Sequence, residues 1–237
     1  MMLSSPIDKL KRQAKLLARD DKLSLHQALN HIAKQNGFSD WSHLASDYAS
    51  ASPAKTLLRQ LKSGDLVLLG ARPGQGKTLL GLELAALADK INRSGYVFTL
   101  DYNAADVWDR LTQLGFDPNG LGRQIMVDTS DNISAAYIAA TVPETSDDAL
   151  IVVDYLQLLD QRRSNPPLDI QIRALKAFAA KHGAIVVVIS QIDRAFELTA
   201  NTFPGITDIR RPNPVDLTLF DKLCFLQDGN IKIETAA

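Results

Sequence analysis

The chain has 237 residues, which is enough for one sizeable α/β core and a small appendage. A net charge of −1 excludes a general attraction to nucleic acid, so any such binding must come from local patches. With 46% hydrophobic and 22% charged residues the composition is that of a globular protein, and no apolar run approaches the roughly 18 residues of a membrane span. The lone Cys224 lies among apolar residues, and the N-terminus has no apolar stretch typical of a secretion signal. We therefore expect a cytoplasmic protein.

Residues 1–50 are predicted to form a small all-α module. Apolar residues recur at helical spacing between Pro6 and Leu17, and Lys and Arg fill the other face. Ser24 is a candidate N-cap for a second helix, which Asn36-Gly37 should end. Phe38, Trp41 and Leu44 are expected to close a three-helix unit. The three histidines of this segment match no standard zinc spacing, so we predict no metal site from His26, His31 and His43.

The module carries a slight excess of positive charge, with seven Lys or Arg against five Asp or Glu. A charged helix face is usually only solvated, so DNA binding is the weaker hypothesis here and docking to a protein partner the stronger one. A run of small residues, ASASP, follows at 49–53 and indicates a linker. It divides the chain into the module, residues 1–50, and a second domain, residues 51–237.

The second domain opens with a phosphate-binding loop. The apolar run Leu66–Leu69 is typical of a buried strand, and an Ala/Leu-rich helix is expected from the following Gly-Lys-Thr to Ile91. Glycines allow backbone N–H groups to curve around an anion, and the helix begins with its positive dipole end at the same point. The octet starts with Ala71 where the usual motif has glycine. The residues expected to bind nucleotide are Arg72, Pro73, Gly74, Gln75, Gly76, Lys77, Thr78 and Leu79.

Strand and helix patterns then alternate, as a mostly parallel sheet flanked by helices requires. The expected strands are 96–100, 124–127, 149–153 and 184–189, with helices at 104–114, from a Ser130 cap toward Val142, and at 169–182. Two late strands, 217–226 and 231–234, are joined by Asp228-Gly229-Asn230, a tight-hairpin signal.

Three polar residues are expected at the carboxyl ends of these strands, on the same rim as the phosphate loop. Asp154 ends an apolar strand and, with the Thr78 hydroxyl, suits Mg²⁺. Asp101 is a candidate to orient or deprotonate an attacking water. Gln191 is a candidate to bond the γ-phosphate. The predicted catalytic residues are thus Lys77, Asp101 and Gln191, with ATP and Mg²⁺ as the cofactors.

These motifs resemble those of RecA-like ATPases, and among them the DnaB-type replicative helicases. GARPGQGKT is similar to that group's phosphate loop, LIVVDYLQLL to its metal-binding strand, and VVVISQIDR to its Ser-Gln-x-x-Arg segment. The resemblance implies a RecA-like P-loop fold and ATP hydrolysis coupled to single-stranded DNA. By that analogy, five arginines are candidate DNA contacts: Arg162, Arg163, Arg194, Arg210 and Arg211. The stretch ALNHIAKQNGFSDWSHL loosely resembles helical modules of bacterial mobile-element proteins.

The resemblance also carries departures. The group has Glu where Asp101 stands, and its Lys-x-Arg element beyond the last strands is not found in DGNIKIETAA. It also has an N-terminal domain in place of the module. We therefore expect slow hydrolysis in DNA transactions and not a self-sufficient helicase. The alternatives are a nucleotide-gated binding module with negligible turnover, and a regulator that binds nucleic acid through residues 1–50. Whether the chain forms an oligomer or a ring stays open.

Overall fold

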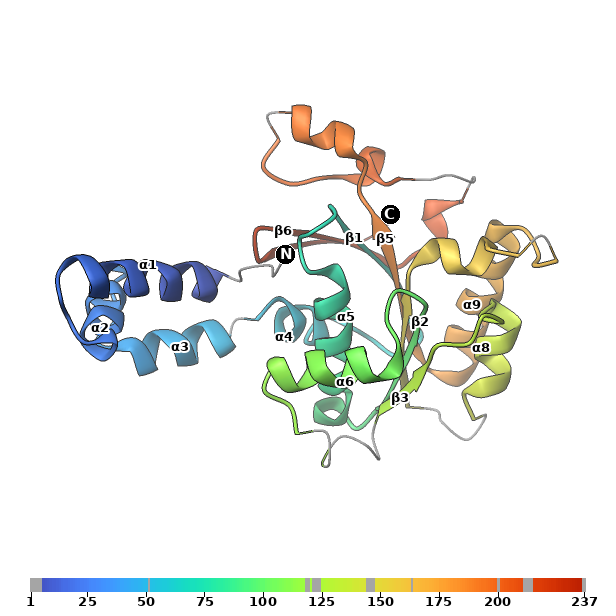
Figure 1. The fold of residues 1–237 in the computed structure, drawn as a ribbon. Coiled ribbons are helices and arrows are strands. Elements are labelled where there is room, and N and C mark those ends of the chain that lie inside the picture. The colour runs from blue at the N-terminus through green and yellow to red at the C-terminus, as the bar shows by residue number, and fades with distance from the viewer. Residues whose placement is uncertain are drawn as a thin grey trace.

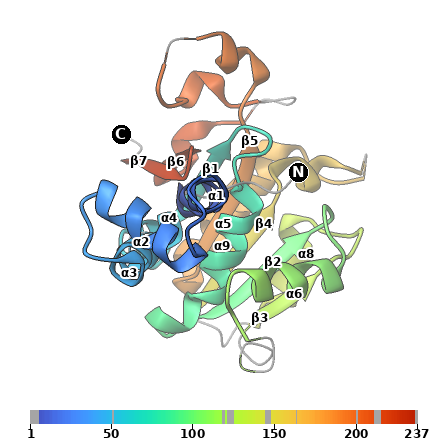
Figure 2. The same ribbon diagram turned by 60° about the vertical axis from the view of Figure 1, so that its left-hand side comes forward.

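The computed structural model describes residues 6–50, 52–117, 120, 125–143, 148–162, 164–199, 201–210 and 215–235, without the side chains of 6–9 and 47–50. The first three helices are α1 (Pro6–Asp20), α2 (Leu25–Gln35) and α3 (Trp41–Ser50). They stand beside the sheet in Figure 1 and come forward in Figure 2. Their small core of Ala14, Ala28 and Ile32 is separate from the two cores that cover the sheet. Within the described ranges, no helix combines the length and the apolar character needed to cross a membrane.

Local sequence explains how these helices begin and end. Ser24 is the N-cap of α2, as predicted, and it forms a capping box with Gln27. The Ser24 Oγ accepts from the Gln27 N–H, and the Gln27 Oε1 accepts from the Ser24 N–H. Asn36 is the C-cap of α2, and Gly37 follows with a φ of 84°, which favours glycine. Trp41 packs partly buried against the core, and Leu44 is fully buried. The expected helices of this module are confirmed.

In the described residues after α3, the chain is built around a seven-stranded sheet with the strand order β3-β2-β4-β5-β1-β6-β7. All neighbouring pairs are parallel except β6 and β7, which form an antiparallel hairpin. The strands are β1 (Leu66–Ala71), β2 (Ser94–Thr99), β3 (Ile125–Asp128), β4 (Ala149–Asp154), β5 (Ile185–Gln191), β6 (Lys222–Gln227) and β7 (Asn230–Thr235). The central strands are buried on both faces, which is why their sequences are apolar throughout.

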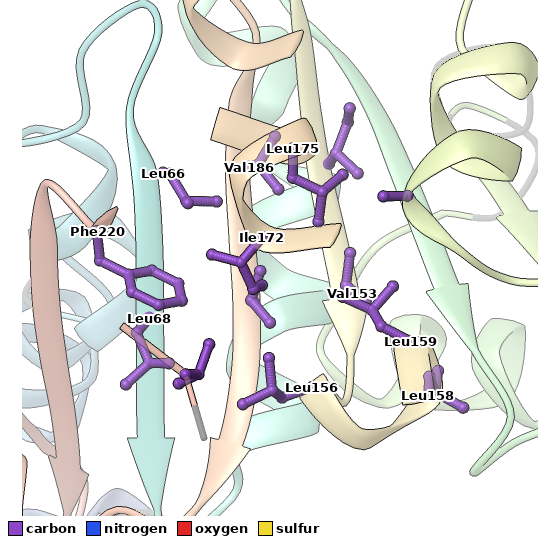
Figure 3. Packing of buried hydrophobic residues seen from close by; sticks show 14 of the residues in the cluster. Leu66, Leu68, Val153, Leu156, Leu158, Leu159, Ile172, Leu175, Val186 and Phe220 are labelled. Carbon is purple, nitrogen blue, oxygen red and sulfur yellow. The ribbon is translucent and has the colours of Figure 1, made fainter. Parts of the chain in front are cut away.

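Helices cover both faces of the sheet (Figure 1). One face carries α4 (Pro53–Leu58), α5 (Lys77–Ala86) and α6 (Ala104–Gln113), and the other carries α8 (Ala135–Thr141) and α9 (Leu168–His182). Figure 3 shows the core on the second face, where Leu66, Val153 and Val186 of the strands meet Ile172 and Leu175 of α9. Alternate strand residues, such as Val152 and Ile189, pack under α5 instead. This alternation decides which strand-end side chains face α5.

Glycines occur at two contact points between helix α5 and the sheet, where there is no room for a Cβ. A Cβ on Gly81 would lie 2.8 Å from the Ile189 Cδ1 and 2.9 Å from the Val152 Cγ1. A Cβ on Gly95 of β2 would lie 2.3 Å from the backbone oxygen of Ala85. These glycines let the helix that follows the phosphate loop rest directly on β2, β4 and β5.

Some expected boundaries were wrong. The helix after the phosphate loop ends at Ala86, and a 3₁₀ turn covers Ala88–Ile91. Ser134 caps α8, whereas the Ser130 Oγ accepts from the Asn132 N–H in the preceding turn. Residues Leu217–Leu219 form a 3₁₀ turn capped by Asp216, so β6 begins only at Lys222. The predicted hairpin is confirmed, with positive φ at both Asp228 and Gly229. Gln124 and Arg163 are outside the described residues.

Candidate nucleotide-binding site

The phosphate loop connects β1 to α5. Gly74 and Gly76 have φ values of 86° and 89°, a conformation that residues with a Cβ rarely adopt. Gly76 is the N-cap of α5 and has no side chain to satisfy the helix, so the first-turn N–H groups are left to bind an anion. Lys77 and Thr78 are the first two residues of this helix, with Thr78 buried and Lys77 half-buried.

The alanine at the start of the motif fits the backbone. Ala71 is the last residue of β1 and is fully buried, in an extended segment that needs no glycine. The neighbouring Gly70 is the crowded position, because a Cβ there would lie 3.1 Å from the Ile192 Cδ1 and 3.3 Å from the Phe225 Cδ1. The one-residue displacement of glycine from the usual pattern therefore follows from the packing of the strand end.

Two polar side chains of the loop bond to other parts of the protein. The Arg72 Nε donates to the Gln227 Oε1 at 3.3 Å, and its guanidinium pairs with Glu197 at 3.2 Å. The Gln75 Oε1 accepts from the Asp228 N–H at 2.8 Å. Both contacts join the loop to the end of β6 and its hairpin turn. The Gln75 backbone N–H also donates to the Arg72 backbone oxygen, at 3.2 Å, so the roles of Arg72 and Gln75 in nucleotide binding stay predictions.

Asp154 ends β4 on the face of the sheet that α5 covers. Its side chain is about 1% exposed, and neither carboxylate oxygen has a hydrogen-bond partner among the described residues. Burial raises the pKa of Asp154 to about 6, while the nearby Thr78 hydroxyl and the Lys77 ammonium oppose that rise. A buried carboxylate without partners beside a threonine hydroxyl is an oxygen donor set that fits a hard divalent cation.

Gln191 is the last residue of β5. Residues two apart in a strand point to the same face, and Ile185, Val187 and Ile189 pack on the α5 side, so the Gln191 side chain is directed to that side too. It is half-buried, and β5 pairs with β1 so that Gln191 lies opposite Ala71 at the start of the phosphate loop. The Arg210 Nη1 donates to the Gln191 Oε1 at 3.3 Å. Gln191 thus lies beside the loop, and its side-chain oxygen already accepts a hydrogen bond from Arg210.

Asp101 follows β2 on an exposed turn, where its N–H donates to the Thr99 Oγ1 at 3.2 Å. Its negative charge contributes to the raised pKa of Asp154, which places the two carboxylates close enough to interact. Within the described residues, no group of three or more His, Cys, Asp or Glu side chains is arranged to hold a metal ion. The candidate cation site is accordingly the pair formed by Thr78 and Asp154.

Comparisons with known proteins agree with this arrangement. Residues 119–218 match the model of the DnaB-like helicase C-terminal domain. The structure of a DnaB-like replicative helicase, described together with its interactions with primase, matches 96% of this chain and 72% of its own, at a TM-score of 0.57 and 17% identity. A KaiC-like protein of the archaeon Pyrococcus horikoshii matches 73% of this chain and 80% of its own, at a TM-score of 0.55 and 16% identity. This chain has a RecA-like fold and resembles the ATPase domains of DnaB-type helicases.

Sequence relatives point to the same type of domain. The replicative DNA helicase DnaB of Synechocystis is 27% identical over 181 residues, which are 63% of this chain and 21% of the relative. DnaB of Geobacillus stearothermophilus is 26% identical over 200 residues, or 68% of this chain and 43% of the relative. The chain therefore spans less than half the length of these relatives.

The candidate DNA contacts of the RecA-like domain are scattered. Arg162 donates to the Asn132 Oδ1 at 2.6 Å, and Arg194 is exposed at the start of the 3₁₀ helix η3 (Arg194–Leu198). Arg210 bonds to Gln191, and Arg163 and Arg211 lie outside the described residues. The segment after β5 projects beyond the carboxyl end of the sheet in both views, coloured orange in Figures 1 and 2.

The sequence patterns missed several residues of the site. Thr99 lies opposite Asp154 in the register of β2 and β4 and is buried with it. The Gln157 Oε1 is buried without a partner in the part of the chain described, and the Gln157 Nε2 lies 3.5 Å from the Arg210 backbone oxygen. The Ser190 Oγ is also buried without a partner there, but Ser190 precedes Gln191 in β5 and therefore faces the opposite side of the sheet. The pairing of Arg72 with Glu197 joins residues far apart in the chain and left no local signal.

Proposed function

We propose that the chain binds ATP with Mg²⁺ and hydrolyses it slowly, as a helicase-like ATPase in DNA transactions. The observation that carries this proposal is the buried, unpartnered carboxylate of Asp154 beside Thr78, at the helix that starts from the phosphate loop. When bound there, Mg²⁺ would neutralise phosphate charge and polarise the terminal phosphoryl group. Thr78 and Asp154 would hold the ion, the loop amides would hold the phosphates, and Lys77 would add a compact positive charge.

Asp101 is the candidate to orient the attacking water, because it follows the neighbouring strand β2 and its charge reaches Asp154. Aspartate is one CH₂ shorter than glutamate, and Asp101 starts from an exposed turn. A water-positioning group that reaches poorly lowers the rate of the chemical step without lowering nucleotide affinity. Slow turnover with intact binding is the result that this geometry supports.

The test is ATP binding and turnover by the purified chain in magnesium buffer, with and without oligothymidylate as the single-stranded DNA. We expect saturable ATP binding and slow turnover, both lost in Lys77→Ala. Lys90→Ala provides a matched control, because Lys90 is a solvent-exposed lysine paired with Asp89 in a 3₁₀ turn that follows α5. Binding without any turnover in either condition would contradict the enzymatic part of the proposal, and an absence of binding would contradict all of it.

A second candidate is a nucleotide-gated binding module, with residues 1–50 and 51–237 as separate domains. The Ser52 Oγ donates to the Glu83 Oε1 at 2.9 Å, so the residue that caps α4 bonds to the helix that carries Lys77 and Thr78. Burial raises the pKa of Glu83. Through this bond the segment leading from α3 contacts the nucleotide-binding helix, which gives nucleotide a route to influence the module.

This alternative is tested by binding of labelled DNA to the full chain, with and without a non-hydrolysable ATP analogue. The basic side chains of α1 that face solvent include Arg12, Lys15 and Arg19. If residues 1–50 contact nucleic acid, Arg12→Glu/Lys15→Glu should weaken DNA binding without changing ATP affinity, and the loss should shrink at high salt. Equal DNA binding by this variant would assign the DNA contact to the ATPase domain, through exposed residues such as Arg194.

A further inference from the structure

The backbone of Arg210 is held against the end of β5. Its N–H donates to the Gln191 backbone oxygen at 2.8 Å, and its carbonyl oxygen lies 3.5 Å from the Gln157 Nε2. The preceding residues form an antiparallel bridge between Ile192 and Ile209, and the Asp193 N–H donates to the Asp208 backbone oxygen at 2.7 Å. The chain that returns from the projecting segment is therefore fixed beside the strand end that carries Gln191.

The side chain of Arg210 turns back to the same residue. Its Nη1 donates to the Gln191 Oε1 at 3.3 Å. A guanidinium has only donors, whereas the glutamine amide has one acceptor oxygen and one donor NH₂ group. The arginine can therefore hold only the oxygen, and this leaves the NH₂ group of Gln191 as the end that is free to bond elsewhere.

This orientation suits the candidate ligand. A phosphate oxygen accepts hydrogen bonds at neutral pH, so a glutamine that contacts it must present its NH₂ group and not its carbonyl oxygen. Without Arg210, the amide could turn either end toward the phosphate loop. With Arg210 on the oxygen, rotation of the amide would give up a charge-assisted hydrogen bond and bring the guanidinium against another donor.

The charge of Arg210 is also uncompensated among the described residues. Arg72 and Arg173 each pair with a carboxylate, Glu197 and Asp216 respectively, whereas no carboxylate lies within ion-pair distance of the Arg210 guanidinium in the described part of the chain. Arg210 is exposed, and its guanidinium contacts the amide of Gln191 at the edge of the candidate nucleotide site.

We propose that Arg210 is a positioning residue that orients the Gln191 amide so that its NH₂ group meets the terminal phosphate of ATP. This inference rests on the proposed function of the site. It gives Arg210 a role within the subunit that holds the nucleotide, different from the DNA contact expected by analogy. The positioning should affect the binding of ATP and not that of ADP, because only a triphosphate has the terminal phosphate that the oriented amide would bond.

The test compares affinities for a non-hydrolysable ATP analogue and for ADP, in magnesium buffer without DNA. One hydrogen bond to a charged group corresponds to a change of about tenfold, so Gln191→Ala and Arg210→Ala should each lower the preference for the triphosphate by about that factor. ADP affinity should stay at the wild-type value in both variants. The double variant should lose no more than either single one, because both substitutions remove the same contact.

Two further variants separate positioning from general effects. Arg210→Lys keeps the charge and one donor, so it should retain part of the triphosphate preference. Arg173→Ala removes an exposed arginine of α9 that pairs with Asp216, and it should leave the preference unchanged. Wild-type preference in Arg210→Ala, or additive losses in the double variant, would overturn the positioning role. A wild-type chain that binds neither nucleotide would instead overturn the proposed function itself, and the positioning role with it.

Discussion

Thr99 lies opposite Asp154 in the register of β2 and β4, and each side chain is about 1% exposed. The Thr99 Oγ1 accepts from the Asp101 N–H, so this hydroxyl is engaged with the turn that follows β2. Both carboxylate oxygens of Asp154 are buried without a hydrogen-bond partner of good geometry among the described residues, while the Thr78 hydroxyl is near enough to lower the pKa of this carboxyl. A negative charge on Asp154 destabilises the nucleotide-free protein, because burial disfavours the ionised carboxyl. A bound cation would compensate this charge.

Removing this charge should stabilise the nucleotide-free protein at high pH. The pKa of Asp154 is raised from 3.8 to about 6, so the folded state binds this proton more tightly than the unfolded state does. The stability that the protonated carboxyl contributes is fully present below pH 3.8 and is lost as the pH rises through about 6. Asp154→Asn should therefore gain up to roughly 3 kcal/mol over the wild type at pH 8, and little near pH 4. Urea unfolding in EDTA across this range measures the difference. A gain that does not vary with pH would contradict the assignment, and the exposed Asp109→Asn is the control.

The same substitution should have the opposite effect once magnesium and nucleotide are present. A ligand at 100 times its Kd stabilises the folded state by about 2.7 kcal/mol. Because Asp154 and Thr78 are the proposed cation ligands, the wild type should show this increase with Mg²⁺ and ATP, and Asp154→Asn should lose most of it. Thermal unfolding with each component added separately provides the measurement. An equal increase in both proteins would remove Asp154 from the cation site.

The sequence predicted those parts of the site that are encoded locally. Gly74, Gly76 and Lys77 lie within four consecutive residues, and the apolar run before Asp154 indicated both the strand and the place where it ends. Contacts between distant segments left no such signal. The position of Gln75 depends on Asp228, which is 153 residues away, and Arg210 reaches Gln191 only because the segment between them folds back.

Some predicted helix and strand boundaries were wrong for a related physical reason. Leu217 and Leu219 are as apolar as the strand that follows them, but the Asp216 side chain accepts from the Thr218 N–H and holds this segment as a turn. Such bonding by Asp competes with sheet pairing and has no counterpart in hydrophobic periodicity. Apolar runs therefore located the core strands but not every point at which they begin.

Removing the side chain of Arg72 should weaken nucleotide binding much less than removing that of Lys77. Arg72 contacts Gln227 and Glu197, and it is about 21% exposed, so its ion pair contributes at most about 1 kcal/mol. We expect Arg72→Ala to lower ATP affinity by no more than about fivefold, through a less firmly held loop, a change within that 1 kcal/mol. Glu197→Gln, measured by the same titration, should have a similar small effect. A loss in Arg72→Ala as large as in Lys77→Ala would show that the arginine leaves Gln227 to bind the nucleotide.

Because α5 packs closely on the sheet, we expect alanine substitutions at Gly81 and Gly95 to lower the free energy of unfolding by different amounts. A Cβ at Gly95 meets the backbone of Ala85, which cannot move without moving α5, whereas a Cβ at Gly81 meets the ends of two side chains. Overpacking against side-chain ends, as in Gly81→Ala, typically lowers the free energy of unfolding by about 1–3 kcal/mol. Gly95→Ala should lower it by more than Gly81→Ala does. Urea unfolding gives both values. Gly205→Ala, where the nearest atom to the new Cβ is 4.0 Å away, is the control with an expected change within about 0.5 kcal/mol. The reverse order would show that α5 shifts more easily than the side chains beneath it.

Lengthening Asp101 by one CH₂ should raise turnover. Asp101 is exposed after β2, and its carboxylate interacts with Asp154 without a direct bond to it. Asp101→Glu lengthens the reach of the carboxylate by one CH₂, and better positioning of the attacking water should increase kcat by about tenfold while ATP affinity stays unchanged. Asp101→Asn keeps the size but removes the charge, so it should lower kcat below the wild-type value. Steady-state turnover and equilibrium binding are measured on all three proteins. If Asp101→Glu is no faster than the wild type while Asp101→Asn is inactive, the aspartate already reaches the water, and slow turnover must have its origin in another part of the site.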